Sequence, residues 1–379
     1  MIETAPLTEP EMVRYSRHLL MPEVGLTGQQ KLKSSSVLIV GLGGLGNPAS
    51  AYLAAAGVGR IGLIDRDNIE ESNLHRQVLY SEADVGASKV LTAARRLHEV
   101  NPLVKVEPHE MTLNSSNALD VLKDYDIVVD ATDNFPARYL INDACVLLGK
   151  PDVYASIFRF DGQASVFYAK RGPCYRCLFP EPPPPNSVPS CADGGVLGVM
   201  PGIIGSIQAA QAISLILGMG EPLIGRLLVF TASDTSFNEL RMRKNPRCPV
   251  CGPNPTITKL IDYDEFCGVT MGTLDFEVSP ASLKREMDEG RNLVLIDVRE
   301  PFEFQICRIE GAKLIPLSTL QSKIGGFGKD EDIVVYCHAG VRSARAAQMM
   351  IDSGFKKARS LRGGISAWAE QVEPGMPRY

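Results

Sequence analysis

The stretch SVLIVGLGGLGNPASAYLAAAGVGRIGLIDRDNIEESNLHRQ, residues 36–77, decides the fold. It begins with an apolar run that ends at Val40 and leads into glycines at Gly41, Gly43 and Gly46. A segment with helical character follows, and a second apolar run comes after it. Strand, glycine loop, helix and strand in this order are typical of a nucleotide-binding unit in a parallel sheet.

The glycines indicate where a nucleotide would bind. Gly41 and Gly43 allow a tight turn and a close approach of the backbone to phosphate, while Gly46 lets the helix pack on the strand. The helix N-terminus offers N–H groups to phosphate oxygens. Asp65, at the end of the second apolar run, is placed to accept a hydrogen bond from a ribose hydroxyl. These features predict a nucleotide site without distinguishing NAD from ATP.

The residues that follow Asp65 favour ATP. SNLHRQ places the amide of Asn73 and the guanidinium of Arg76 near the expected phosphates, and Lys89 opens the next helix. Asp133, in DATDN after a strand, is a hard carboxylate suited to Mg²⁺ that bridges phosphates. Taken singly, each charge is most simply a solvated surface residue. Taken together at strand ends, they suit triphosphate chemistry better than hydride transfer.

The chain has 379 residues, of which 45% are hydrophobic, so two domains are favoured over one. In the first half, strand-like runs alternate with helical segments, which predicts a mainly parallel sheet covered on both faces. A second α/β pattern follows a stretch of weak periodicity. We expect one domain over residues 1–260, a linker over 261–272 and a second domain over 273–379. The expected strands cover residues 37–40, 61–65, 104–109, 126–132, 293–300, 313–317 and 332–337, and the expected helices 47–56, 89–100 and 343–353.

Composition argues against several classes of protein. The formal charge of −5 gives no reason to expect nucleic-acid binding, and the N-terminal residues do not resemble a secretory signal. Residues 196–220 carry no charge and are long enough to span a bilayer, but polar residues and Pro201 interrupt them. We therefore expect a buried helix beside the sheet and no membrane span. Nine cysteines, an odd number, argue against a disulfide framework and for the cytoplasm.

Four cysteines form two CxxC pairs, Cys174 with Cys177 and Cys248 with Cys251. This is the spacing of two zinc half-sites, and four thiolates without histidine indicate a closed, structural Zn²⁺ site. A redox-active CxxC is the alternative, which the presence of two pairs disfavours. The cysteines that we expect in packing or at the surface are Cys145, Cys267 and Cys307.

Cys191 stands apart, in the polar stretch VPSCADGG after a run of four prolines. A lone cysteine is most often a buried filler of small volume. This one precedes a possible helix N-terminus in an apparently exposed loop, a setting that favours the thiolate. Cys191 is therefore a candidate catalytic residue.

A second reactive cysteine is indicated near the end of the chain. DIVVYCHAGVRSARAAQMM combines a strand, a short loop and a helix, with Cys337 at the start of the loop and Arg342 at its end. Loop amides, the helix dipole and Arg342 all favour an anion on Cys337. Rhodaneses and cysteine phosphatases share this arrangement, but the phosphatase loop is longer by one residue. The shorter loop, residues 338–341, suits the terminal sulfur of a persulfide.

Residues 1 to about 260 closely resemble the MoeB/ThiF family of adenylating enzymes, relatives of the ubiquitin-activating enzymes. The matching segments are RYSRH, VLIVGLGGLG, SNLHRQ, VGASKV, DATDN, CYRC and NPRCPVCG. The resemblance implies ATP with Mg²⁺, and adenylation of the C-terminal carboxylate of a ubiquitin-like carrier protein that ends in Gly-Gly. The residues that it implies as contacts of ATP or its metal are Gly44, Asp65, Asn73, Arg76, Lys89, Asp133 and Asn134.

The same resemblance implies two further roles. Arg17, in RYSRH, resembles the arginine that reaches into the site of a partner subunit, which implies a homodimer. Cys191 matches the position of the family's crossover loop, whose cysteine takes the acyl group or resolves a disulfide.

Residues 273–379 resemble a rhodanese domain through LIDVREPFEF, IEGAKLIPL, CHAGVRS and LRGGISAW. This resemblance implies that Cys337 carries a persulfide. Asp297 and Arg299, in IDVRE, are expected to hold the strand and the loop in place. His338 is expected either to act as a general acid or base or to line the loop.

The sequence thus predicts an α/β protein: a Rossmann-like, ATP-binding adenylating domain with structural zinc, followed by a smaller α/β rhodanese domain. The expected function is adenylation of a sulfur-carrier protein of the MoaD, ThiS or Urm type, and transfer of sulfur to give its C-terminal thiocarboxylate. Such carriers serve molybdopterin, thiamine, cysteine or tRNA-thiolation pathways. The expected sulfur donor is a cysteine desulfurase or thiosulfate. Two alternatives stay open: an NAD-dependent Rossmann oxidoreductase and a non-catalytic scaffold that binds the carrier.

Overall fold

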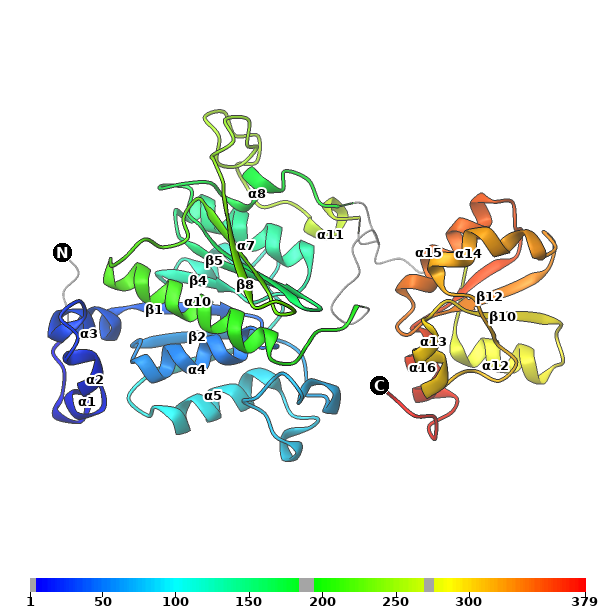
Figure 1. Cartoon of the computed structure of the whole chain (residues 1–379), viewed down its shortest axis with the longest axis horizontal. Helices are drawn as coiled ribbons and strands as arrows, with labels where there is room; N and C mark the ends of the chain where they lie inside the picture. Colours follow the sequence, from blue (N-terminus) through cyan, green and yellow to red (C-terminus); the bar gives the residue numbers. More distant parts are fainter. Residues whose placement is uncertain (1–4, 184–193, 269–275) are drawn as a thin grey trace. The chain divides into compact units, whose positions relative to one another are not determined.

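The structure is a computed structural model of the whole chain, and it describes residues 5–183, 194–268 and 276–379 (Figure 1). These residues divide into two compact units. The first is formed by residues 5–183 and 194–268, and the second by residues 276–379. Each unit has its own sheet and its own hydrophobic core.

The first unit is built on an eight-stranded sheet with the strand order β3-β2-β1-β4-β5-β6-β7-β8. The strands are β1 (Ser36–Val40), β2 (Arg60–Asp65), β3 (Lys105–Glu110), β4 (Ile127–Asp130), β5 (Asp152–Phe158), β6 (Asp161–Phe167), β7 (Arg226–Thr231) and β8 (Ser236–Arg241). From β3 to β5 all neighbours are parallel, and from β5 to β8 all are antiparallel. The predicted parallel sheet is therefore confirmed and extended by an antiparallel half.

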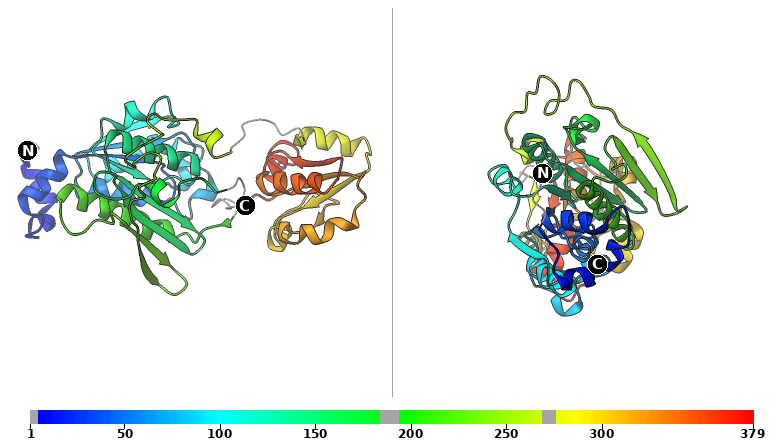
Figure 2. Two further views of the ribbon diagram at one scale, coloured as in Figure 1. Left: turned by 90° about the horizontal axis from the view of Figure 1, so that it is seen from above. Right: turned by 90° about the vertical axis from the view of Figure 1, so that its left-hand side faces the viewer.

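The antiparallel half ends in an exposed hairpin. In the left view of Figure 2 the β7–β8 hairpin, in yellow-green, extends from the body of the first unit. All residues of the edge strand β8 after Ser236 are exposed. This edge of the sheet therefore faces solvent.

Helices cover both faces of the first sheet. They are α1 (Glu9–Arg14), α2 (Ser16–Leu19), α3 (Gly25–Ser34), α4 (Gly46–Ala56), α5 (Lys89–Val100), α6 (Ala118–Leu122), α7 (Phe135–Leu148), α8 (Tyr175–Leu178), α10 (Met200–Leu217) and α11 (Tyr263–Phe266). Alternate residues of β1 enter two cores: Val37 and Ile39 pack with α4, α5 and α10, whereas Leu38 and Val40 pack with α6 and α7. Figure 1 shows α4 and α5 together along one side of the strands. Burial on both faces explains why the four residues of β1 after Ser36 are all apolar.

The apolar stretch 196–220 forms α10, which is long and apolar enough to cross a membrane by length and composition. In the structure α10 packs against α4, β5 and β6. Ile204 and Ala212 are fully buried in the core, which confirms the prediction of a helix beside the sheet. The opposite side, which includes Ile203 and Ile207, is partly exposed, so the helix is not buried all round.

The expected linker 261–272 is wrong in its first part, because residues 261–268 pack on the first unit. Tyr263, on α11, is buried and its hydroxyl donates to the Asp143 carboxylate at 2.9 Å. The same carboxylate accepts from Nε and Nη2 of Arg176, both at 2.8 Å. Residues 261–268 have weak periodicity, so the sequence did not indicate these long-range contacts. The division of the whole chain at 1–260, 261–272 and 273–379 otherwise stays a proposal.

The second unit is a five-stranded parallel sheet with the order β11-β10-β12-β13-β9. Its strands are β9 (Glu277–Val278), β10 (Leu293–Asp297), β11 (Lys313–Leu314), β12 (Asp332–Tyr336) and β13 (Ala358–Leu361), and its helices are α12 (Pro280–Asp288), α13 (Pro301–Ile306), α14 (Leu317–Lys323), α15 (Val341–Asp352) and α16 (Gly364–Gln371). Two cores again cover the two faces. The strand expected over 313–317 is shorter than predicted, since Pro316 has no N–H for the ladder.

The buried ion pair of Asp143 and Arg176 generates a prediction about stability. Their side chains are 0% and 1% exposed, so Asp143→Asn leaves a buried guanidinium without its counter-charge. We expect this change to lower the free energy of unfolding of the first unit by about 3–5 kcal/mol. Asp120→Asn is the control, because the Asp120–Lys123 pair is exposed and screened by solvent, so its loss should change the stability far less. Urea denaturation of both variants measures the difference, and equal losses would contradict the account.

Candidate functional site

The glycine loop that follows β1 has no space for a side chain at Gly44 or Gly46, but it is open at Gly43. A Cβ at Gly46 would lie 1.9 Å from the carbonyl oxygen of Gly41, and one at Gly44 would lie 2.8 Å from the ring of Pro201. Gly41 also has a φ of 93°, which favours glycine. At Gly43, by contrast, the nearest atom to a Cβ is Nε2 of Gln77 at 3.8 Å. The loop is therefore a narrow backbone turn that is open above Gly43, as a phosphate cradle requires.

Asp65 braces this loop from the end of β2. Its Oδ2 accepts a hydrogen bond from the Leu42 N–H at 2.7 Å, and its Oδ1 accepts from the Asp67 N–H at 2.8 Å. The strands β1 and β2 are parallel neighbours, so their carboxyl ends lie side by side. The carboxylate thus lies beside the glycine loop, where the sequence placed it, and its contact with ribose stays a prediction.

The segment SNLHRQ also lies on the glycine loop. A Cβ at Gly44 would be 3.7 Å from Cγ of Arg76, and Gln77 lies next to Gly43. Asn73 is buried, and its side-chain oxygen accepts from the Glu70 N–H at 3.3 Å. Two of the predicted nucleotide contacts are thus held in the turn beside the cradle.

Lys89 begins α5 with its ammonium 3.1 Å from Oδ2 of Asp67. The Lys89 side chain is 10% exposed, whereas that of Asp67 is 59% exposed. Asp67 follows Asp65 by two residues, so this ion pair places a cation at the same end of β2. It is partly buried and therefore less screened than a surface pair.

Asp133 follows β4, which lies directly beside β1. Its side chain is exposed, and the next residue, Asn134, caps α7 by accepting from the Ala137 N–H at 3.0 Å. Gly41 and Ala131 are in close contact, so DATDN and the glycine loop meet at one edge of the sheet. The structure thus brings Gly41, Gly43, Gly44, Gly46, Asp65, Asn73, Arg76, Lys89, Asp133 and Asn134 to the carboxyl ends of β1, β2 and β4 or to the segments beside them.

Sequence reasoning missed the residues that hold this edge. Arg138 donates from Nη2 to the Thr132 carbonyl at 3.2 Å and to the Ser156 hydroxyl at 3.1 Å, which fixes the turn before Asp133. Asp130 is fully buried, and burial, partly opposed by Arg138, raises the pKa of its carboxyl. Of the two aspartates in DATDN, the exposed Asp133 is therefore the better metal ligand. A charged residue inside the first turns of a mostly apolar helix was the signal that would have indicated Arg138.

Arg17 does not join this site in the described part of the chain, and the position of Cys191 is not described. Arg17 lies exposed on α2, and within residues 5–183, 194–268 and 276–379 no hydrogen bond or ion pair joins it to the residues above. Cys191 lies outside the described residues.

The two CxxC pairs meet in space. The sulfurs of Cys174 and Cys248 are 3.5 Å apart, those of Cys177 and Cys251 are 3.4 Å apart, and all four lie within 4.8 Å of one another. Cys177 also accepts from the Asn245 N–H at 3.3 Å. The four thiols therefore form a cluster that is able to hold one metal ion.

In the second unit Cys337 follows β12 at the start of a tight loop. Its Sγ is buried and accepts from the Gly340 N–H at 3.1 Å, and α15 begins at the next residue. Gly340 has a φ of 98°, and a Cβ at Gly364 would lie 2.5 Å from the Cys337 carbonyl oxygen. The loop therefore presents the Gly340 amide to the sulfur and depends on glycines from two segments.

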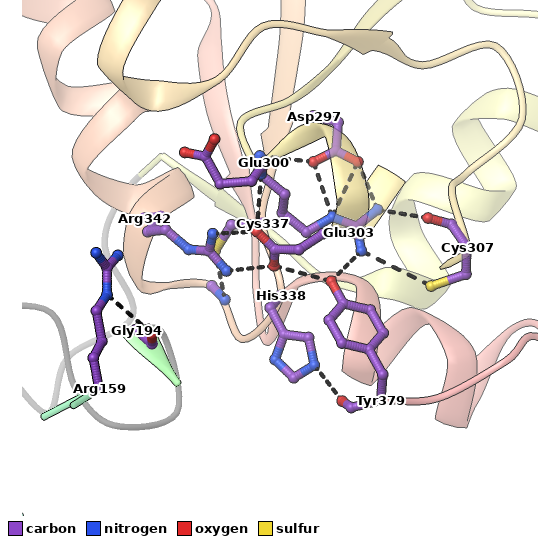
Figure 3. Close-up of polar contacts among 12 residues, drawn as sticks. Arg159, Gly194, Asp297, Glu300, Glu303, Cys307, Cys337, His338, Arg342 and Tyr379 are labelled. Carbon is purple, nitrogen blue, oxygen red and sulfur yellow. Dashed lines mark hydrogen bonds and ion pairs between the residues drawn. The ribbon is translucent and has the colours of Figure 1, made fainter. Parts of the chain in front are cut away.

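Arg342, at the end of this loop, is held by Glu303 of α13 (Figure 3). Nη1 and Nη2 of Arg342 lie 2.7 and 2.8 Å from the two oxygens of the Glu303 carboxylate. The Tyr379 hydroxyl donates to the same carboxylate at 3.0 Å. His338 Nε2 lies 2.8 Å from the backbone oxygen of Tyr379. The predicted residues Cys337, Arg342 and His338 are thus brought together, with two partners that the sequence did not reveal.

Asp297 and Arg299 form a buried pair behind these residues. Nη2 of Arg299 lies 2.6 Å from Oδ2 of Asp297, and both side chains are fully buried. Arg299 also donates to the Cys307 carbonyl at 2.7 Å and to the Tyr379 hydroxyl at 2.5 Å. These contacts support a structural role for the pair, which the sequence predicted.

Comparisons with known proteins identify both units. Residues 15–250 match the ThiF family, and residues 279–371 match the rhodanese-like domain. The chain belongs to the ThiF family. This ThiF-family chain also resembles full-length proteins that combine both parts. The probable adenylyltransferase/sulfurtransferase MoeZ of Mycobacterium tuberculosis is 48% identical over 99% of this chain and 98% of its own length.

Other relatives agree with this assignment. Adenylyltransferase and sulfurtransferase MOCS3 of Drosophila ananassae is 45% identical over 98% of this chain and 86% of its own length. The sulfur carrier protein adenylyltransferase of Thermus thermophilus is 55% identical over 69% of this chain and 98% of its own length. The ThiF-family chain is therefore an adenylyltransferase and sulfurtransferase, and these relatives do not favour the NAD-dependent oxidoreductase.

Solved structures of similar fold include E. coli MccB with ATP. That structure is 28% identical, has a TM-score of 0.56, and the match covers 63% of this chain and 73% of MccB. MccB in complex with N-formylated MccA matches with a TM-score of 0.57 at 28% identity, over 63% of this chain and 75% of MccB. A ThiF-family fold is thus supported by structure as well as by sequence.

The contact between Gly46 and Gly41 generates a prediction. In Gly46→Ala the new methyl group would clash with the Gly41 carbonyl, so the loop would have to open. We expect the free energy of unfolding to fall by about 2–4 kcal/mol and the stabilisation by ATP to be lost. Gly202→Ala, in α10, is the control, because nothing lies within 4 Å of its Cβ. Urea unfolding and the thermal shift with ATP measure both effects. Full ATP stabilisation in Gly46→Ala would contradict the proposed cradle.

Proposed function

We propose that this protein adenylates the C-terminal glycine of a ubiquitin-like sulfur-carrier protein with ATP and then converts it into a thiocarboxylate with sulfur carried on Cys337. The observation that carries the proposal is the presence of two complementary sites in one chain. The first unit has a glycine cradle with cations and a carboxylate at its edge, and the second has a cysteine in an amide-lined loop. One site activates a carboxylate, and the other supplies the sulfur that replaces its oxygen.

In the first step, a carrier carboxylate oxygen attacks the α-phosphate of ATP, and pyrophosphate leaves. The amides around Gly43 receive phosphate, and Arg76 and Lys89 stabilise the charge that develops on its oxygens. Asp65 accepts from the ribose. Asp133 and Asn134 would hold Mg²⁺, which supplies charge stabilisation on the phosphates.

We further propose that the first unit acts as a homodimer. Arg17 is exposed on α2 and has no described partner in its own nucleotide site, which supports its use by a partner subunit. The partly exposed apolar side of α10, with Ile203 and Ile207, is suited to burial between subunits.

In the second step, the Cys337 persulfide attacks the carbonyl carbon of the acyl adenylate, and AMP leaves. The product is an acyl disulfide on Cys337, which a second thiol must attack to release the thiocarboxylate. We assign this attack to Cys191, which then forms a disulfide with Cys337, or alternatively carries the acyl group itself as a thioester.

The sulfur comes from a cysteine desulfurase or from thiosulfate. We also propose a reducing, cytoplasmic location, which the odd number of nine cysteines favours.

We propose that the four-cysteine cluster of the first unit holds structural Zn²⁺. Tetrahedral thiolates at about 2.3 Å from zinc lie roughly 3.8 Å apart. Three sulfur pairs of the cluster are 3.4, 3.5 and 3.9 Å apart, and all four sulfurs lie within 4.8 Å of one another. The ion would join the segment after β6 to the knuckle after β8 and would leave no open position for catalysis.

Asp133→Ala tests the adenylation step. We expect the rate of ATP–pyrophosphate exchange with a Gly-Gly carrier to fall by roughly a hundredfold or more, because Mg²⁺ would lose a carboxylate ligand. The stability of the protein should not change, because the Asp133 side chain is exposed. Asp120→Ala, at an exposed position of α6, should exchange normally. Normal exchange in Asp133→Ala would remove Asp133 from the mechanism, and no exchange in the wild type with any carrier would favour the non-catalytic scaffold.

Cys337→Ala separates the two steps. Pyrophosphate exchange should stay intact because the nucleotide site lies in the first unit, whereas persulfide formation should disappear with the nucleophile. Cys307→Ala is the matched control, a buried cysteine of the same unit that should still allow labelling of a persulfide. A persulfide and normal thiocarboxylate production in Cys337→Ala would show that another cysteine carries the sulfur.

A further inference from the structure

The charge of Arg342, the loop arginine that the sequence assigned to anion binding, is matched by a carboxylate in the second unit. Its guanidinium makes a two-point ion pair with Glu303, with N···O distances of 2.7 and 2.8 Å. The two side chains are 16% and 6% exposed. A bidentate pair in so little solvent has fixed geometry and a net charge of zero.

Glu303 is held in place from two further directions. Its Oε2 accepts from the Glu300 N–H at 2.8 Å, as part of the capping box of α13. Its Oε1 accepts from the Tyr379 hydroxyl at 3.0 Å. Burial acts to raise the pKa of the Glu303 carboxyl, but the hydrogen bonds of Arg342 and the Glu300 backbone outweigh it and lower the pKa, so Glu303 is ionised. Its charge therefore stays opposite that of Arg342.

A second pair of opposite charges lies beside the loop. Asp297 and Arg299 form a buried neutral pair, and His338 Nε2 contacts the Tyr379 backbone oxygen and the Ser366 hydroxyl, at 2.8 and 3.4 Å (Figure 3). Support for an anion on the Cys337 sulfur therefore comes from the backbone, through the Gly340 N–H and the first turn of α15. The loop is built for the one negative charge of a thiolate or persulfide.

We infer that Glu303 is a specificity-determining residue: it masks Arg342, so that Cys337 accepts sulfur from monoanionic or neutral sulfane donors in preference to dianionic thiosulfate. The inference rests on the proposed role of Cys337 as the persulfide carrier. Thiosulfate brings two negative charges to a thiolate, and among the described residues the guanidiniums of Arg299 and Arg342 each face a carboxylate that cancels their charge. A persulfide donor adds at most one charge and meets no such penalty.

The transfer reactions balance for both donor classes. The Cys337 thiolate attacks the outer sulfur of thiosulfate, the S–S bond breaks, and sulfite leaves with its two charges while the cysteine becomes a persulfide anion. With methanethiosulfonate the same S–S bond breaks and methanesulfinate leaves with one charge. Cyanide then takes the outer sulfur as thiocyanate and restores the thiolate. These two donors therefore differ mainly in charge while they share one kind of bond cleavage.

The test compares full-length wild type with Glu303→Gln, which keeps the size and oxygen of the side chain but removes its charge. Thiocyanate formation gives kcat/KM for thiosulfate and for methanethiosulfonate. We expect Glu303→Gln to raise the ratio of kcat/KM for thiosulfate to kcat/KM for methanethiosulfonate by about fivefold to tenfold. The reason is that the unmasked positive charge of Arg342 attracts a dianion more strongly than a monoanion. In the double variant Glu303→Gln/Arg342→Gln this gain should disappear.

Glu286→Gln is the matched control. Glu286 makes a comparable two-point pair with Arg359, at 3.0 and 2.8 Å, near the start of β12 and away from Cys337 at its end. Glu286→Gln changes the net charge by the same amount as Glu303→Gln. The ratio of kcat/KM for the two donors should nevertheless stay at the wild-type value. An unchanged ratio in Glu303→Gln, or an equal rise in Glu286→Gln, would overturn the inference.

Salt dependence of the wild type provides a second measurement if Glu303→Gln fails to fold. With Arg342 masked, kcat/KM for thiosulfate should not fall with ionic strength more steeply than that for methanethiosulfonate. A steeper fall for thiosulfate would show an unmasked cation and would overturn the inference. If neither donor forms a persulfide on Cys337, the proposed function itself fails, and that result is distinct from an unchanged donor ratio.

Discussion

The close backbone contact between Gly41 and Gly46 is the constraint on which the nucleotide site depends. A Cβ at Gly46 would lie 1.9 Å from the Gly41 carbonyl oxygen, so the strand can turn directly into α4 when glycine occupies this position. This turn brings the N-terminus of α4 to the carboxyl end of β1, where β2 and β4 end as well. Asp65, Lys89 and Asp133 reach the same edge because the strands are parallel neighbours.

The two units have the same kind of anion-binding loop, but the side chains around the two loops differ in charge. Each places its functional loop between the carboxyl end of a parallel strand and the first turn of a helix, where backbone amides receive an anion. In the first unit, cations and an exposed carboxylate surround the loop, as suits a highly charged nucleotide. In the second unit, the Glu303–Arg342 pair cancels the side-chain charge beside Cys337. The first site is thus adapted to a polyanion and the second to a single sulfur anion.

The sequence predicts those parts of the fold whose signals lie in consecutive residues. The run from Val37 to Asp65 and the loop after β12 contain strand, turn and helix signals in consecutive residues, and the structure has these elements within one or two residues of the expected limits. The four cysteines were also predictable as a cluster, because their CxxC spacing is a local pattern.

Contacts between distant residues that no sequence motif marks were not predictable. Tyr263 appeared to be part of a linker, because its partner Asp143 lies 120 residues earlier. Glu303 and Arg342 are 39 residues apart, so the motif around Cys337 shows a free arginine where the structure shows an ion pair. Such pairings depend on the packing of whole elements, which periodicity and spacing do not record.

The most direct test of the central claim is the intact mass of a Gly-Gly carrier after incubation with the full-length protein, ATP, Mg²⁺ and a sulfane donor. The account predicts that the carrier gains the mass difference between sulfur and oxygen, and that this gain requires both ATP and the donor. A carrier that is adenylated but never gains sulfur, with Cys337 present as its persulfide, would contradict the proposed coupling of the two sites.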